Sequence, residues 1–265
     1  MDLLPKKSLG QHFLLNPSSV EKILSLAKVD ATDHIVEIGP GPGVMTRLLA
    51  SIAARVVAIE KDRRFVQNLR ANLEFPNLEI VEKDVLSVEW SQVLPPIHQK
   101  WKVVANLPYN IATEIIFRLL ESRSLFASLT LMVQKEVGER LVAVPGNKDY
   151  GVLSILTQIF SESRIVMKLS PGAFTPPPKV SSVVVEFKIS ETCRFPINDL
   201  PLFKALVRAG FGQRRKMIRN ALEKGMHGFT SERLLLALEK AEILPTARAE
   251  TVPIEKWVSL ANLLA

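Results

Sequence analysis

Alternation between short apolar runs and helical patterns, over residues 30–135, is the feature that most constrains how this chain can fold. The apolar runs are rich in Val and Ile, are only a few residues long, and lie at 35–39, 55–60, 78–84, 102–107 and 129–134. Such runs are typical of strands that are buried on both faces of a sheet. The segments between them carry apolar residues three and four positions apart, as amphipathic helices do. Regular alternation therefore predicts an α/β, Rossmann-like fold with a mostly parallel, doubly wound sheet.

The pattern changes further along the chain. A helix is expected at 150–160, and a strand pair at 167–171 and 182–189 would complete a sheet of seven strands. From about residue 191 only helical patterns remain, at 201–210, 215–224, 231–240 and 254–264. We therefore expect two domains, an α/β domain over residues 1–190 and a small all-helical domain over residues 191–265.

Composition argues against several classes of protein. No apolar run approaches the roughly 18 residues of a membrane span, and the N-terminus lacks the apolar core and cleavage site of a signal peptide. Cys193 is the single cysteine, which rules out a disulfide framework and indicates a reducing compartment. The four histidines are scattered without metal-ligand spacing. We expect a cytoplasmic protein with no metal and no membrane partner, and nothing demands more than a monomer.

Positive charge is concentrated near the C-terminus. The net charge is +7, and residues 190–265 carry 12 basic and 8 acidic side chains. Within them, segment 203–225 holds seven basic residues and one acidic residue, Glu223. Such a run can be a solvated helix face, but the scarcity of acids favours a polyanionic partner whose phosphates relieve the repulsion. The candidate RNA contacts are Arg208, Arg214, Arg215, Lys216 and Arg219.

The turn after the first apolar run, EIGPGPG at 37–43, indicates a ligand site. Glycines at a strand-to-helix turn let a ligand approach the backbone closely. A dinucleotide site would need G-x-G-x-x-G, but the residue three beyond Gly41 is Val44. Pro40 and Pro42 also remove two N–H groups that a pyrophosphate would use. The turn therefore favours a nucleoside cofactor without phosphates and disfavours an NAD-dependent oxidoreductase.

Two acids follow the next two apolar runs. Glu60 lies 21 residues beyond Gly39, where a carboxylate can accept hydrogen bonds from both ribose hydroxyls. Asp84 ends the third run, where its side chain could take an adenine amino group. Either acid alone could instead be a helix N-cap. Together with the glycine turn, at the same edge of the sheet, they indicate an adenosine cofactor, S-adenosylmethionine.

The segment Asn106-Leu107-Pro108-Tyr109 ends the fourth run, at the same edge as the expected cofactor. The exocyclic amine of a nucleobase is a poor nucleophile because its lone pair is delocalised into the ring. The Asn106 side-chain oxygen and the Leu107 carbonyl, aimed by the rigid φ of Pro108, can accept its N–H groups and favour a pyramidal nitrogen. Tyr109 can stack on the base. The segment therefore predicts methylation of a base amine, with nitrogen and methyl group held in line.

Four stretches resemble the bacterial small-subunit rRNA adenine N6,N6-dimethyltransferase family, namely 6–16, 37–43, 106–113 and 174–182. Further similar segments extend the resemblance over nearly the whole chain, at 134–143, 150–154 and 211–222. The resemblance implies a class I methyltransferase domain with a helical, RNA-binding C-terminal domain. It also implies four methyl transfers, two onto each of two adjacent adenosines in the hairpin near the 3′ end of 16S rRNA, within the 30S subunit or its precursor.

The resemblance also implies cofactor contacts, carried over position by position: His12, Leu14, Gly39, Glu60, Asp84 and Asn106. Many relatives have Asn in place of His12, and either side chain can form a hydrogen bond. Without the resemblance to this family, the sequence around His12 would favour a loop histidine with no functional role. Phe174, which precedes three prolines, resembles the family's second aromatic, facing Tyr109 across the target base. Its sequence context alone favours a core residue at a rigid turn.

Two other functions remain open from the sequence. The 23S rRNA adenine methyltransferases associated with macrolide resistance share the glycine turn and the Asn-Leu-Pro-Tyr segment. Segments 134–143 and 211–222 favour the small-subunit enzyme instead. A mainly non-catalytic ribosome assembly factor could keep the cofactor as a structural ligand, although an intact 106–109 segment argues against a purely non-catalytic role.

Overall fold

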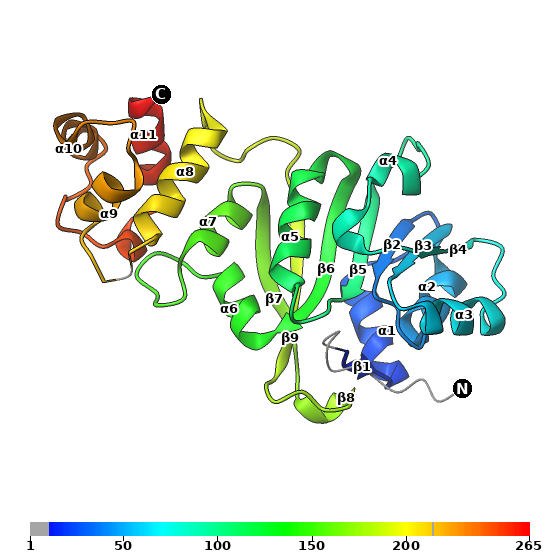
Figure 1. Cartoon of the computed structure of the whole chain (residues 1–265). Helices are drawn as coiled ribbons and strands as arrows, with labels where there is room; N and C mark the ends of the chain where they lie inside the picture. The colour runs from blue at the N-terminus through cyan, green and yellow to red at the C-terminus, as the bar shows by residue number, and fades with distance from the viewer. Residues whose placement is uncertain (1–10, 214) are drawn as a thin grey trace. The chain divides into compact units, whose positions relative to one another are not determined.

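Two compact units make up the chain, which the computed structural model describes at residues 11–213 and 215–265 (Figure 1). The first unit comprises the chain up to residue 138 together with 162–189, and the second comprises 139–161 together with 190–265. Residues 139–161, predicted to belong to the α/β domain, group with the C-terminal helices instead.

A seven-stranded sheet runs through the first unit, in the order β4-β3-β2-β5-β6-β9-β7. Five of its strands pair in parallel: β2 (His34–Ile38), β3 (Arg55–Glu60), β4 (Leu78–Glu82), β5 (Trp101–Asn106) and β6 (Phe126–Gln134). β9 (Ser182–Ile189) runs antiparallel to β6, and β7 (Ser161–Leu169) follows it at the edge. The predicted mostly parallel, Rossmann-like sheet is confirmed.

The strand order reverses between β2 and β5. From β2 the chain winds outward through α2 (Val44–Ile52), β3 and α3 (Arg63–Asn72) to β4. From β5 it winds the other way, through α5 (Ala112–Glu121) to β6. Because β2 and β5 are parallel neighbours, their carboxyl ends lie side by side while the connections that follow them diverge. Open α/β sheets bind ligands in the crevice at such a switch point.

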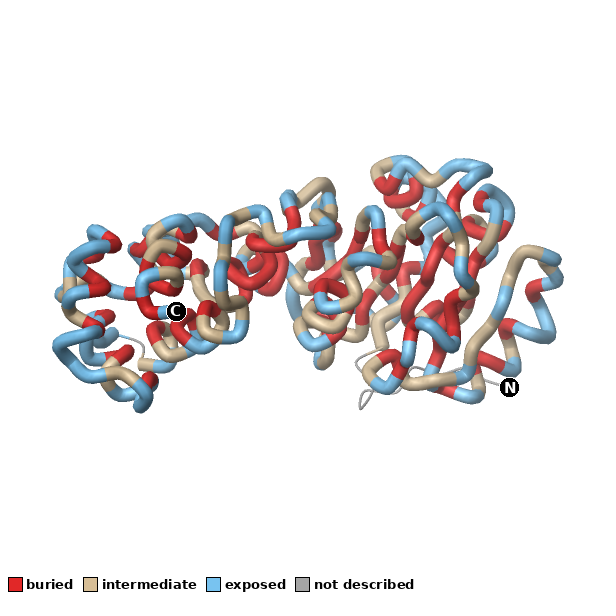
Figure 2. The backbone as a smooth tube through the Cα atoms, turned by 90° about the horizontal axis from the view of Figure 1, so that it is seen from above, coloured by how far each residue is buried: buried red, intermediate tan, exposed pale blue. Residues whose placement is uncertain are grey.

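The central strands are buried on both faces, as their apolar runs predict. Val36, Val57 and Val103 are completely buried, and Figure 2 shows the middle of this unit as buried backbone. Helix α1 (Pro17–Leu26) packs with α2 on one face, in a cluster with apolar side chains of β2 and β5. Burying one Val or Leu side chain stabilises the fold by about 1.5–3 kcal/mol. The strand ends are therefore a rigid base for a site.

Two features of the first unit were not predicted. A separate two-stranded sheet pairs β1 (Phe13–Leu14) with β8 (Phe174–Thr175). β7 begins at Ser161 rather than at residue 167. Its first half alternates buried or half-buried with exposed side chains instead of forming an apolar run, because it lies at the edge of the sheet.

Helices alone form the described part of the second unit beyond residue 190, as predicted. They are α8 (Leu200–Phe211), α9 (Ile218–Gly225), α10 (Ser231–Lys240) and α11 (Ile254–Leu264), with α7 (Val152–Gln158) from the earlier segment. Trp257 is completely buried at their centre. A Cβ at Gly210 would lie 2.3 Å from its ring, so this close approach needs glycine.

Shorter elements complete the chain: α4 (Trp90–Val93), α6 (Lys135–Leu141) and the 3-10 turns Val85–Ser87, Arg123–Leu125, Pro171–Ala173 and Ala249–Thr251. None of the described helices is long and apolar enough to cross a membrane. Within the same described residues, no three metal-ligating side chains come together.

Candidate active site

A pocket opens at the carboxyl edge of the sheet, where the connections after β2 and β5 diverge. Its walls are the turn after β2, the end of β3, the turn after β4 and the segment after β5, and residues 11–13 close it from another side. The structure brings most of the predicted site residues together here: His12, Gly39, Glu60, Asp84, Asn106, Leu107, Pro108 and Tyr109.

The turn after β2 needs its glycines. Gly39, Gly41 and Gly43 have φ values of +66°, +54° and +87°, a region that other residues enter only at a cost. A Cβ on Gly41 would lie 2.6 Å from the Phe13 ring, and one on Gly43 would lie 2.5 Å from the Leu69 side chain. The turn is therefore tightly packed from behind, with its backbone exposed to the pocket at two of these positions.

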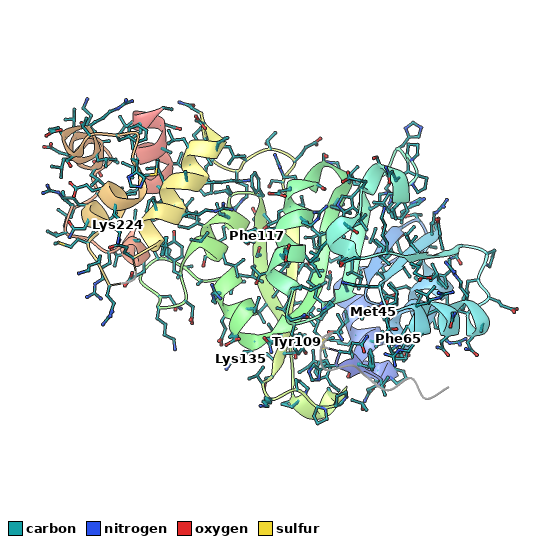
Figure 3. All side chains as sticks on the ribbon, viewed as in Figure 1. Met45, Phe65, Tyr109, Phe117, Lys135 and Lys224 are labelled. Carbon is teal, nitrogen blue, oxygen red and sulfur yellow. The ribbon has the colours of Figure 1, made fainter. Side chains whose placement is uncertain are left out.

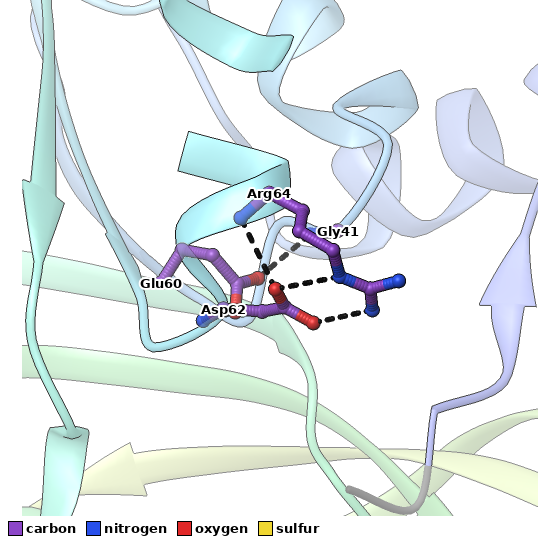
Figure 4. Close-up of polar contacts among 4 residues, drawn as sticks. All are labelled: Gly41, Glu60, Asp62 and Arg64. Atoms are coloured by element: carbon purple, nitrogen blue, oxygen red, sulfur yellow. Dashed lines mark hydrogen bonds and ion pairs between the residues drawn. The ribbon is translucent and has the colours of Figure 1, made fainter. Parts of the chain in front are cut away.

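Glu60 fastens this turn to the start of α3 (Figure 4). One carboxylate oxygen accepts a hydrogen bond from Gly41 N–H at 3.1 Å, and the other accepts from Asp62 N–H at 2.8 Å. Burial raises the pKa of Glu60, and these backbone donors partly offset that effect. The N-cap of α3 is Asp62, which accepts from Arg64 N–H at 3.1 Å. Glu60 is thus a fixed wall of the pocket rather than a helix cap.

Asp84 caps a turn and lines the pocket as well. Its carboxylate accepts from Leu86 N–H at 3.0 Å, at the start of the 3-10 turn, and pairs with Lys61 Nζ at 2.7 Å. The hydrogen bond from Lys61 is the main reason why the pKa of Asp84 lies below its ordinary value. Asp84 therefore stays ionised at neutral pH, as an acceptor on the pocket rim.

Asn106, the last residue of β5, carries a side-chain oxygen that no other described residue engages. Its Nδ2 donates to the main-chain carbonyl of His12 at 2.8 Å, which fixes the orientation of the amide. Its Oδ1 is buried and accepts no hydrogen bond from any other described residue. An unsatisfied buried acceptor costs about 1–3 kcal/mol. Such an atom beside a pocket is suited to an incoming N–H group.

The Tyr109 ring is held by two neighbours, and Figure 3 labels it near the start of β9. Its hydroxyl lies 2.5 Å from Ser182 Oγ, and the His12 ring stacks on it with centroids 5.3 Å apart and planes at 22°. His12 Nδ1 in turn donates to the Pro176 carbonyl at 2.7 Å. Burial raises the pKa of Tyr109, so its hydroxyl keeps its proton at neutral pH. The ring is a half-buried, immobilised platform.

Leu107 and Pro108 form the connection between these two polar residues. Leu107 is almost completely buried, and its N–H donates to the Met132 carbonyl at 3.1 Å. The Pro108 carbonyl accepts from Ile111 N–H at 3.2 Å. These bonds anchor the connection to β6 and to the start of α5. The use of the Leu107 carbonyl as an acceptor for substrate stays a prediction.

Leu14 and Phe174 do not line this pocket. They face each other in the β1–β8 pair and are buried in the apolar cluster under α1 and α2. Phe174 thus occupies the core position that its sequence context favours, and its contact with a base stays a prediction. Ser182, which holds Tyr109, was not predicted as a site residue. Its place in the 174–182 stretch was the available signal.

The candidate RNA contacts lie in the second unit, and the described ones are all exposed: Arg208, Arg215, Lys216 and Arg219. Arg214 lies outside the described residues. Arg219 forms an ion pair with Glu223 at 3.0 Å. Arg215 has a φ of +76°, which is uncommon for a residue other than glycine. Positive charge therefore surrounds the turn between α8 and α9.

One family model matches almost the entire chain. It is described as ribosomal RNA adenine dimethylase, and the match spans residues 3–265. The chain belongs to the ribosomal RNA adenine dimethylase family. It is accordingly a methyltransferase enzyme with the class I fold of that family.

Relatives of this family are similar over their full length. Ribosomal RNA small subunit methyltransferase A of Ruegeria pomeroyi is 47% identical over 270 residues, covering 99% of this chain and 93% of the relative. Its counterpart in Geobacter metallireducens is 40% identical over 261 residues, covering 98% and 95%.

Two solved structures share the fold. A dimethyladenosine transferase from Plasmodium falciparum matches with a TM-score of 0.80 at 27% identity, covering 94% of this chain and 96% of that one. The 23S rRNA methyltransferase ErmE matches with a TM-score of 0.71 at 26% identity, covering 95% and 99%. In sequence this dimethylase is therefore nearer to the small-subunit enzymes than to ErmE.

Proposed function

We propose that this dimethylase methylates N6 of two adjacent adenosines in the 3′-terminal hairpin of 16S rRNA, twice each, with S-adenosylmethionine as the methyl donor. The observation that carries the proposal is the buried Asn106 Oδ1, which accepts no hydrogen bond from the described part of the chain and lies in one pocket with Tyr109, Glu60 and Asp84. Similarity to proteins named small subunit methyltransferases supports the small ribosomal subunit, or its precursor, as the substrate.

The residues of the pocket fit this cofactor. Glu60 and Asp84 are acceptors held at the ends of adjacent strands, where ribose hydroxyls and an adenine amine can reach them. Pro40 and Pro42 leave the turn without two donors that a pyrophosphate would need. When bound, S-adenosylmethionine supplies an electrophilic methyl group on a sulfonium.

Asn106 accounts for the acceptor chemistry. By accepting one N–H of the adenine amine, Oδ1 favours a pyramidal nitrogen whose lone pair is free to attack. Methyl transfer would form a bond from this nitrogen to the methyl carbon as the bond between that carbon and the donor's sulfur broke, and the methylated nitrogen would then release a proton to water. A monomethylated amine still has one N–H, so the same oxygen can serve the second transfer.

Two further groups act on the RNA. The fixed Tyr109 ring offers a face on which an adenine drawn from its stack can rest. The exposed cations of the second unit would bind phosphates, which contribute affinity without reading sequence. Chemistry and RNA affinity would then depend on different residues.

The test is transfer of radiolabelled methyl groups from S-adenosylmethionine to small ribosomal subunits that lack the modification, followed by nucleoside analysis. We expect dimethyladenosine in 16S rRNA and none with large subunits as substrate. Labelling of the large subunits instead would assign the ErmE-like activity. Binding of cofactor and small subunits without any product would favour a ribosome assembly factor that does not use its methyl donor.

A further inference from the structure

Glu37 is a buried carboxyl that the proposed methyl transfer does not use. It lies in β2, two residues before Gly39, and only 2% of its surface is exposed. Neither its Oε2 nor the buried Thr46 hydroxyl forms a hydrogen bond of good geometry with another described residue, although that hydroxyl lies near enough to lower the pKa of the carboxyl. Buried polar groups are rarely left unpaired, because desolvation without a hydrogen bond is costly. A second unsatisfied acceptor, Asn106 Oδ1, lies on the adjacent strand.

The strand register brings these two side chains to the same face of the sheet. β2 and β5 pair in parallel with Ile35 opposite Lys102 and Val36 opposite Val103. If this register continues toward the carboxyl ends of the two strands, Gly39 lies opposite Asn106. Side chains alternate between faces, so Glu37 projects on the same side as Asn106. The next position on the Glu37 face, just after β2, is Gly39, which has no side chain to fill the space beside Asn106.

A small cavity is bounded by both residues. It has a volume of about 30 Å³, and its other walls are mostly apolar: Phe13, Leu14, Pro40, Pro42, Val44 and Met45. Glu37 and Asn106 contribute its polar side chains, while Asn106 also lines the large pocket. This volume accommodates a water molecule but not a ribose or a base.

We propose that a single water molecule in this cavity bridges Glu37 Oε2 and Asn106 Oδ1, which makes Glu37 a positioning residue for Asn106. The water donates one hydrogen to the Asn106 oxygen and occupies one of its two lone pairs. The second lone pair stays directed at the large pocket. The amide is then held at both ends, by the His12 carbonyl on Nδ2 and by the water on Oδ1.

The protonation of Glu37 agrees with this arrangement. Burial raises the pKa of Glu37 to about 8; the Thr46 hydroxyl offsets part of this effect, and the negative charge of Glu60 adds to it. At neutral pH the carboxyl is therefore mostly protonated, and it can donate to the water as well as accept from it. Glutamine has the same two capacities, so Glu37→Gln should preserve the bridge, whereas Glu37→Leu should abolish it.

A structural experiment tests the bridge without reference to activity. Crystal structures of the full chain, alone and with S-adenosylhomocysteine, should show one water within hydrogen-bond distance of both oxygens, and this water should persist in Glu37→Gln. A cavity without a water, or one filled by the amino group of the cofactor product, would overturn the proposal. This readout stands even if the proposed methyl transfer fails its own test.

The kinetic experiment rests on the proposed function. Loss of one positioning hydrogen bond should lower kcat of Glu37→Leu about tenfold, with the Kd for S-adenosylmethionine changed less than about twofold because no cofactor contact is removed. Glu37→Gln should keep kcat near the wild-type value. Thr157→Val, a buried polar-to-apolar change in α7 of the second unit, serves as the matched control.

The outcomes separate positioning from stability. Equal kcat in wild type and Glu37→Leu would contradict a positioning role. A rise in the cofactor Kd with unchanged kcat would also contradict it, since Glu37 would then act on binding. Thermal melting shows whether Glu37→Leu folds; if it does not, the water in the wild-type and Glu37→Gln structures decides alone.

Discussion

The large pocket of the first unit and the basic turn of the second unit differ in how their polar groups are satisfied. In the pocket, the Glu60 and Asp84 carboxylates already accept hydrogen bonds from the protein, whereas the buried Asn106 Oδ1 accepts none from the described residues. At the basic turn, Arg215 and Lys216 are exposed and no ion pair holds either of them within the described residues.

This difference indicates how one chain can assign catalysis and RNA affinity to different groups of residues. Groups that are buried and fixed before the substrate arrives lose little entropy on binding and keep their geometry, which suits a reaction that depends on alignment. Exposed cations adapt to a flexible backbone and act through long-range attraction, which salt screens. Changes in the pocket should therefore alter kcat or cofactor affinity by an amount that does not depend on salt concentration. Changes at the basic turn should alter RNA affinity by an amount that does depend on it, since salt screens these contacts.

Asn106→Ala should give the largest effect. Removing a positioned acceptor for the reacting amine should lower kcat by about 100- to 1,000-fold, as loss of one preorganised polar group does in other enzymes. Cofactor affinity should fall much less. Single-turnover methyl transfer and calorimetric titration of S-adenosylmethionine measure the two quantities, with Asn72→Ala on the exposed end of α3 as control. Methyl transfer near the wild-type rate would show that the Asn106 side chain is not needed as an acceptor for the reacting amine.

Glu60→Ala should affect binding more than chemistry. The change removes the expected ribose acceptor and also leaves Gly41 N–H and Asp62 N–H without their partner. We expect the cofactor Kd to rise about 10- to 100-fold, since hydrogen bonds to a charged group are worth about 1.5–3 kcal/mol. Glu82→Ala is the matched control, because Glu82 pairs opposite Glu60 in the strand register but is exposed. An unchanged Kd would leave Glu60 a purely structural role.

Replacement of Arg214, Arg215 and Lys216 by alanine should weaken RNA binding several-fold and make it less sensitive to salt. For every phosphate that the variant no longer neutralises, the slope of log K against log salt should fall by about one unit. Arg219→Ala should do less, because its charge is partly engaged by Glu223. Binding of a 16S hairpin between 50 and 200 mM salt, about the range where such slopes are measured, provides the test. A slope identical to that of wild type would show that these side chains do not contact RNA phosphates and are an ordinary solvated surface.

The sequence predicted the parts of the site that local patterns determine. The Val- and Ile-rich runs located the strand ends, and the glycines and prolines at 37–43 identified the ligand turn, because each signal is carried by neighbouring residues. Contacts between distant segments had no such signal. The β1–β8 pair is only two residues long on each side, too short for periodicity, and it takes Phe174 into the core. The bonds from Glu60 to the turn and from Ser182 to Tyr109 are likewise tertiary.

Tyr109→Phe should give the smallest effect and shows which part of Tyr109 matters. The ring that would support the base is kept, while the hydrogen bond to the fully buried Ser182 hydroxyl is removed. We expect kcat to fall only a few-fold, about the effect of a 1 kcal/mol loss in positioning. Tyr109→Ala, which removes the ring, should be far more damaging, since stacking on a base is worth about 1–3 kcal/mol. Single-turnover rates for the two variants make the comparison. If Tyr109→Phe were as impaired as Tyr109→Ala, the hydroxyl rather than the ring face would be the group that the reaction requires.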